Sequence, residues 1–228
     1  MKHLALALTL AAVPCFSQEA VVKAPRAKSD FNITADPKSP QWRNVAVHKA
    51  AVDPFGKPAG ANAFDFRIQW TPQFIYFHFT CPYTELNLKE NPATKEETNK
   101  LWEWDVAEVF IGGDMNNIHQ YREYQVSPQG EWVDLDIDRK SPKPEAHKWD
   151  SGFTVAASID KANKVWYGAM KVPVSSITST PAKAGAEYRM NIYRLAGKAP
   201  SRQSIMWTPV GVRSHHTPEK FGRLVLAE

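Results

Sequence analysis

The chain of 228 residues is 43% hydrophobic and 11% aromatic, which is enough for one large β domain with a sizeable core. Its net charge of +4 comes from 28 basic and 24 acidic residues scattered along the sequence, with no run dense enough to follow a phosphate backbone, so we expect no nucleic-acid binding. Of the two cysteines, Cys15 lies in a segment expected to be removed, and Cys81 alone cannot form an internal disulfide.

Residues 1–20 have the three-part layout of a secretory signal peptide. Lys2 precedes an apolar run over residues 4–13, and small and polar residues follow. Because the run is too short to span a bilayer, we expect export to the periplasm or the medium without membrane insertion. A lipoprotein anchor at Cys15 is the alternative, and Pro14 directly before it disfavours that cleavage.

Beyond this segment, we interpret residues 21–29 as a flexible leader and residues 30–228 as one domain. Short segments rich in β-branched and aromatic residues recur between Pro, Gly, Asn or Asp clusters, and helical periodicity is nearly absent. Alternating apolar residues predict a hairpin, 64–70 with 74–79. Further strands are expected at 106–111, 121–126, 131–137, 153–159, 165–172, 188–195, 204–207 and 223–226. About ten strands favour an all-β fold, a two-sheet antiparallel β-sandwich of the immunoglobulin-like or jelly-roll-like kind.

Two polar connections are expected to form long surface loops. Residues 83–100 run directly into a tryptophan-rich stretch, and residues 139–148 contain two prolines and a histidine. Long loops in compact domains are usually functional or mobile. Residues 173–177 predict a short helix after a strand.

The stretch 101–111 sets two tryptophans, Trp102 and Trp104, and two carboxylates, Asp105 and Glu108, against the start of an apolar strand. A tryptophan at a sheet edge offers a flat apolar face, and carboxylates accept hydrogen bonds from hydroxyl groups, which together suit a sugar ring. The alternative is that both tryptophans fill a core, as aromatic residues commonly do. Acids beside the indoles would repel a phosphate backbone and favour a neutral polar ligand.

A second acidic stretch lies at residues 131–138. Alternate residues of a strand point to the same side, so Asp134, Asp136 and Asp138 are expected to share one face. Neighbouring carboxylates repel one another, so a cation, arginines or water must offset that repulsion, and a Ca²⁺ ion held by Asp134 and Asp136 is one candidate. A solvated polar face is the alternative.

Catalytic interpretations find less support in the sequence. Glu108 and Asp134 can be cast as the two carboxylates of a glycoside hydrolase, but no further feature supports that pair. No Gly-x-Ser-x-Gly motif is present, and Cys81 lies in an apolar segment typical of an inert buried thiol. His215 and His216 would point to opposite faces of a strand, which disfavours a zinc site made from them alone and leaves one free to face a ligand.

In several separated places the chain resembles carbohydrate-binding module family 9, a sugar-binding branch of the DOMON-like β-sandwiches. The N-terminal part is similar in a short strand at residues 31–36, in Trp42 and in the second hairpin strand. A Trp-x-x-Asp-x-x-Glu-x-Phe-Ile signature begins at Trp102, and a closing Phe-Gly-x-Leu-x-Leu strand begins at Phe221. The order and spacing of these motifs carry the resemblance over most of the chain.

The resemblance implies a noncatalytic module that holds a sugar between two stacked tryptophans, with polar side chains and structural calcium ions. Trp102 matches the first stacking tryptophan and Glu108 matches a hydrogen-bonding acid. His215 falls where the family has its second tryptophan, and Gln125 falls where it has an arginine. An imidazole still offers a flat ring and a hydrogen-bond donor, and Trp104 or Trp132 offers another face.

We therefore expect a secreted module that binds a mono- or oligosaccharide without turnover, in support of polysaccharide breakdown by a partner glycoside hydrolase. The expected carbohydrate-binding residues are Trp102, Trp104, Asp105, Glu108, Gln125 and His215. The chief rival is a cell-envelope interaction protein that keeps the scaffold and has lost the sugar site, and a hydrolase is a third alternative. A haem-binding role, found in other DOMON-like domains, lacks a suitable Met and His pair here.

Overall fold

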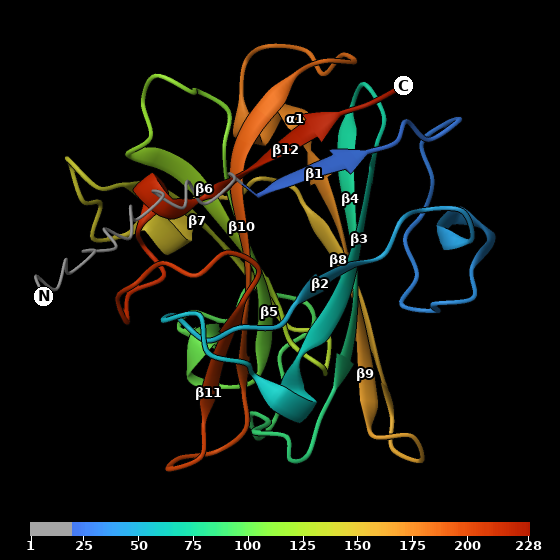
Figure 1. The fold of residues 1–228 in the computed structure, drawn as a ribbon, viewed down its shortest axis with the longest axis vertical. Helices are drawn as coiled ribbons and strands as arrows, with labels where there is room; N and C mark the ends of the chain where they lie inside the picture. The colour runs from blue at the N-terminus through green and yellow to red at the C-terminus, as the bar shows by residue number, and fades with distance from the viewer. Residues whose placement is uncertain (1–19) are drawn as a thin grey trace, which may run out of the picture.

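A computed structural model describes residues 20–228, which form a β-sandwich of two sheets (Figure 1). The all-β, two-sheet prediction is confirmed. The expected signal peptide, with Cys15, lies outside the described residues except for Ala20. Within the described part, no helix has the length and apolar character needed to cross a bilayer.

The larger sheet has seven strands. Their order is β1 (Val21–Ala24), β12 (Gly222–Leu226), β10 (Glu187–Ala196), β5 (Val106–Gly112), β6 (Gln120–Val126) and β7 (Trp132–Asp138), with β11 (Gln203–Met206) also paired to β10. The first half of β10 pairs with β12 and its second half with β11, so both strands lie along the same edge of β10. All neighbours are antiparallel except β1 and β12, which run parallel.

The smaller sheet has five antiparallel strands. Their order is β2 (His48–Ala50), β3 (Phe64–Trp70), β4 (Phe74–Pro82), β9 (Val165–Pro173) and β8 (Thr154–Asp160). The predicted hairpin is confirmed, because Trp70 pairs with Ile75 and the Thr71 amide donates to the Phe74 carbonyl at 2.8 Å.

Within residues 20–228, helical structure is confined to single turns. These are η1 (Pro40–Trp42), η2 (Gly60–Asn62), η3 (Leu101–Glu103), η4 (Ala146–Lys148), α1 (Val174–Ile177) and η5 (Pro218–Lys220). The short helix expected at residues 173–177 is present as α1. In Figure 1 these turns lie at the ends and outer surfaces of the two layers.

The core fills the space between the sheets and is made by alternate residues of their strands. On β5, Ala107, Val109 and Ile111 belong to this core, so Glu108 and Phe110 point to the outer side of the larger sheet. Burial of each large apolar side chain stabilises the fold by about 1.5–3 kcal/mol. The strand pattern therefore leaves one sheet face free to carry a site.

The N-terminal predictions require correction. Residues 21–24, expected in a flexible leader, form β1, with Val22 and Ala24 exposed by only 1% and 0%. Residues 31–36, matched to a strand by the family resemblance, form no strand. Phe31 instead stacks on Tyr76 of β4, with ring centroids 3.9 Å apart, so this segment is held by its aromatic ring rather than by a sheet ladder.

Candidate functional site

The outer face of the larger sheet carries a row of polar groups surrounded by apolar ones. Strand register places Glu108 of β5 between Tyr193 of β10 and Gln125 of β6. The next row places Phe110 beside Glu123. These positions follow from the two-residue period of each strand, since their neighbours in sequence point into the core.

A single amide joins the two buried glutamates of this face. Gln125 Nε2 donates to Glu108 Oε1 at 3.0 Å and to Glu123 Oε1 at 2.5 Å. Glu108 and Glu123 are exposed by 1% and 4%. Burial, reinforced by the nearby Glu108, raises the pKa of Glu123 well above its ordinary value, which favours the neutral carboxyl form.

His215 covers Glu108 and is held at both ring nitrogens. Its Nδ1 lies 2.9 Å from Glu108 Oε2, and its Nε2 lies 2.6 Å from the Ser204 hydroxyl. The ring also stacks on Tyr193, with centroids 4.4 Å apart and planes inclined by 4°. The Tyr193 hydroxyl donates to the His215 carbonyl at 2.8 Å. The imidazole is therefore a fixed flat ring with one face backed by tyrosine.

His216 closes the other end of the network. Its Nδ1 lies 2.8 Å from the Tyr121 hydroxyl, and its Nε2 lies 3.9 Å from Glu123 Oε2. Burial lowers the pKa of His216, which favours the neutral ring. Together the two histidines fasten the loop before η5 to the sheet.

The two predicted tryptophans lie on the same face as Glu108. Both are partly buried and pack against an apolar cluster that includes Val106 and Leu135. The Arg202 guanidinium donates to the Trp102 and Trp104 carbonyls at 2.6 and 2.7 Å, which fixes the backbone of this turn. Neither indole is sealed inside the core between the sheets.

A hollow of about 370 Å³ lies beside His216. Ile137 and Ala146 line it, and both also pack against the apolar cluster that supports Trp102 and Trp104. The indoles, the apolar cluster and the hollow thus form one continuous patch, which we call the outer-face patch. The volume of the hollow falls in the range of about 300–1,000 Å³ typical of ligand pockets.

A family model described as "Carbohydrate family 9 binding domain-like" matches residues 40–228. The chain belongs to this family. The resemblance seen in its motifs is thereby confirmed. No curated protein matches the chain.

Solved structures share the fold of this family 9 domain. A proposed carbohydrate-binding protein from Bacteroides uniformis has a TM-score of 0.73 at 16% identity, over 91% of this chain and 99% of that one. A family 9 module from Caldicellulosiruptor kristjanssonii in complex with cellotriose has a TM-score of 0.66 at 12% identity, over 91% and 94% of the two chains. A family 9 module from C. kristjanssonii in complex with glucose has a TM-score of 0.63 at 10% identity, over 91% and 95% of the two chains.

Asp105 of the family 9 domain does not join Glu108. It is fully buried, and its Oδ1 accepts from the Gly197 amide at 2.7 Å and from the Asn87 amide at 3.2 Å. The expectation that Asp105 meets sugar hydroxyls is therefore wrong for this structure, because the carboxylate ties loops together instead. Its position three residues before Glu108 puts it on the opposite side of the chain from that residue.

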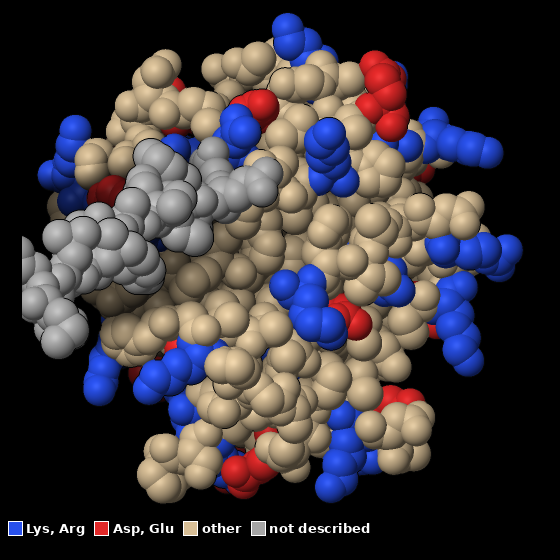
Figure 2. All heavy atoms as spheres, viewed as in Figure 1, with Lys and Arg blue, Asp and Glu red and all other residues tan. Residues whose placement is uncertain are grey.

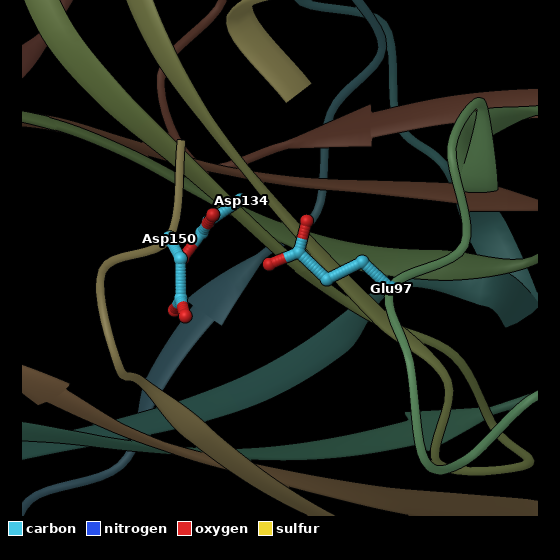
Figure 3. Close-up of side chains that lie close together, drawn as sticks. All are labelled: Glu97, Asp134 and Asp150. Atoms are coloured by element: carbon cyan, nitrogen blue, oxygen red, sulfur yellow. The ribbon is translucent and has the colours of Figure 1, made fainter. Parts of the chain in front are cut away.

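Asp134 and Asp136, the predicted metal ligands, have different partners and do not form one site. Asp136 forms ion pairs with Arg122 and Lys143, which already balance its charge. Asp134 instead lies with Glu97 and Asp150, and ligand oxygens of these three carboxylates lie within 4.8 Å of one another. Figure 3 shows the Glu97 carboxylate reaching from its loop toward the two aspartates.

These three carboxylates suit a divalent cation that prefers oxygen ligands. Asp134 is fully buried, and its Oδ1 has no hydrogen-bond partner among the described residues. Burial and repulsion from Asp134 and Asp150 raise the pKa of Glu97 to about 8. A Ca²⁺ ion would satisfy the orphaned oxygen and remove the repulsion, so the residues present fit calcium.

The sequence missed several members of both groups. Glu123 could have been found, since it stands two residues before Gln125 and so shares its face. Ser204 and Tyr193 reach His215 from two other strands, and no local spacing signals that contact. Glu97 lies in a loop with no periodic pattern, so only the fold reveals its meeting with Asp134.

Proposed function

We propose that the chain is a noncatalytic carbohydrate-binding domain whose outer-face patch holds a sugar against Trp102. The observation that carries this proposal is the patch itself. Two partly exposed indoles, an apolar floor and a hollow adjoin a network of buried polar groups on one sheet face. Such an arrangement offers both the flat apolar surface and the hydrogen-bonding groups that a sugar ring needs.

His215 acts as a second flat face in this proposal. Both ring nitrogens are held and Tyr193 backs one side, so the imidazole keeps its orientation without a ligand. Its side chain is 13% exposed, whereas that of Glu108 is only 2% exposed. Glu108 therefore positions His215 rather than contacting sugar hydroxyls itself. Gln125, on the neighbouring strand β6, donates a hydrogen bond that holds Glu108 in place.

We propose the absence of turnover on physical grounds as well. Glycoside hydrolysis needs two carboxylates that flank the scissile bond. Glu108 and Glu123 are both buried and bonded to one amide, so they leave no space for a sugar between them. Each aromatic contact adds only about 0.5–1.5 kcal/mol beyond area burial, and we expect modest affinity.

The family supports the choice of ligand. Its members from C. kristjanssonii were solved with cellotriose and with glucose, so mono- and short oligosaccharides are the class we propose.

Residues 1–20 have the sequence of a signal peptide, and we propose that the protein is exported and assists a separately encoded glycoside hydrolase. Structural calcium at Glu97, Asp134 and Asp150 forms part of the same proposal.

Isothermal titration against a panel of neutral mono- and oligosaccharides tests the proposal. We expect heat of binding for wild type and at least a tenfold weaker affinity for Trp102→Ala, since about 1.4 kcal/mol of stacking and burial corresponds to a factor of ten. Phe55→Ala is the control, because Phe55 is 56% exposed but lies outside the patch.

Two outcomes would favour the rivals. A folded protein that gives no heat with any sugar would fit an interaction protein with a lost site. Release of reducing sugar that disappears in Glu108→Ala would instead reveal a hydrolase. Equal loss of affinity in Trp102→Ala and Phe55→Ala would contradict the placement of the sugar.

A further inference from the structure

One cation of the outer-face patch has no acidic partner. Arg139 follows the end of β7 and lines the hollow beside His216. Among residues 20–228, no carboxylate forms an ion pair with Arg139. Its backbone is nevertheless fixed, because the Arg139 amide donates to the His119 carbonyl at 3.0 Å.

The acids near Arg139 are already engaged elsewhere. Asp136 pairs with both Arg122 and Lys143, which leaves no negative charge to spare. Asp138 accepts the backbone amides of Lys140 and Ser141 at 2.9 and 3.0 Å, and the Gln120 side chain at 3.0 Å. These bonds hold the Asp138 carboxylate, which also lines the hollow, against the turn that follows β7. Arg139 thus remains the uncommitted charge of the hollow.

The floor of the hollow suits the ring of a sugar. Ile137, Pro142 and Ala146 supply apolar surface, and His216 supplies a largely neutral ring at one side. A guanidinium presents donors in a planar fork that matches a carboxylate with two parallel hydrogen bonds. A sugar that lies on the apolar floor and carries a carboxylate would satisfy both features together.

We propose that the hollow selects uronic acids, with Arg139 binding the sugar carboxylate and the apolar floor holding the pyranose ring. This inference rests on the proposed function, since the hollow continues the patch that carries Trp102. It adds what that function leaves open, namely the class of sugar. Neutral sugars bind the same patch without the contact to Arg139.

Glucuronic acid and glucose make a matched pair of probes, because they differ only at the carboxylate. Calorimetry on wild type, Arg139→Gln and Lys140→Gln separates the contributions. Lys140 is the control, since it is an exposed cation next in sequence that does not line the hollow. We expect wild type to bind glucuronic acid about tenfold more tightly than glucose, as one charged hydrogen-bonded contact allows.

Arg139→Gln should abolish that tenfold preference and leave glucose affinity within about twofold, whereas Lys140→Gln should keep the preference. Equal binding of both sugars by wild type would overturn the inference while the proposed function stands. Equal effects of the two variants would also overturn it, by showing a general attraction to surface charge. Failure of every sugar to bind folded wild type would instead contradict the proposed function itself.

Discussion

At the scale of single residues, the outer face buries two carboxylates within hydrogen-bond reach of one amide. Burying a charge is costly unless it is paired, and burial raises the pKa of Glu123, which favours its neutral form; Glu108 shares the Gln125 amide with Glu123 and contacts His215. The network thereby holds an imidazole in place at a position where stacking geometry matters. We expect the energetic cost of this network to appear in the pH dependence of stability.

Glu123→Gln should make the protein more stable at neutral pH. The pKa of Glu123 is raised above its ordinary value of 4.5, so between the two values the folded state holds one more proton than the unfolded chain. The free energy of unfolding therefore falls as pH rises through this interval. Glutamine is neutral at every pH and removes that loss.

Thermal unfolding followed by circular dichroism from about pH 5 to about pH 8 measures the effect, with the gap between variant and wild type widening as pH rises. Glu219→Gln is the control, since Glu219 is exposed. Parallel stability profiles for wild type and Glu123→Gln would show that Glu123 is charged in the folded state.

At the scale of elements, the acidic cluster joins three segments that share no sheet contact. Glu97 precedes η3, Asp134 lies on β7 and Asp150 follows η4. Burial, together with repulsion from the two neighbouring aspartates, raises the pKa of Glu97 to about 8. A cation would convert the repulsion into a link between the segments.

Calcium should therefore raise the melting temperature, and a chelator should lower it. At a concentration about 100 times the Kd, linkage predicts about 2.7 kcal/mol, which corresponds to a shift of about 5–10 °C for a chain of this size. Asp150 is exposed, so Asp150→Asn should fold and lose most of the shift.

Asp136→Asn is the matched control for calcium. Asp136 lies on the same strand but is paired with Arg122 and Lys143, so its variant should keep the full shift. A calcium shift lost in Asp136→Asn and kept in Asp150→Asn would restore the pairing first expected from the sequence.

Gly222, the first residue of β12, lies where there is no space for a side chain. A Cβ at Gly222 would lie 2.6 Å from the Ala20 carbonyl oxygen and 2.7 Å from the Trp207 ring. Gly222→Ala should therefore lower the free energy of unfolding by about 1–3 kcal/mol, measured by urea titration. Gly112→Ala should cost less, because its nearest atom would be 3.1 Å away. An equal loss of unfolding free energy in the two variants would mean that β1 shifts to make room for the added methyl group.

Sequence patterns located the long strands because one buried face imposes alternation, as the hairpin of β3 and β4 shows. They missed β1 and β2, which are four and three residues long and too short for a period to stand out. The family resemblance assigned Glu108, Gln125 and His215 to one site, and the structure brings these three side chains into contact. Contacts between distant loops, such as Glu97 with Asp150, have no local pattern and required the fold.

At the scale of the whole molecule, the core and the candidate site lie on opposite sides of the larger sheet. The smaller sheet and the inner side of the larger one make the core, while the outer side of the larger sheet carries the outer-face patch. Figure 2 shows Lys and Arg side chains scattered over the visible face with Asp and Glu among them, rather than gathered in a stripe. On this face the distribution gives no track for a phosphate backbone.

The most direct test of the central claim is an NMR titration that follows the indole N–H signals of the tryptophans as cellotriose or glucuronic acid is added. We predict that the signals of Trp102 and Trp104 move with saturation, while those of the buried Trp42 and Trp166 stay fixed. Trp102→Phe assigns its own signal by removing it. Binding that leaves the Trp102 and Trp104 signals unmoved would contradict the placement of the sugar on the outer face.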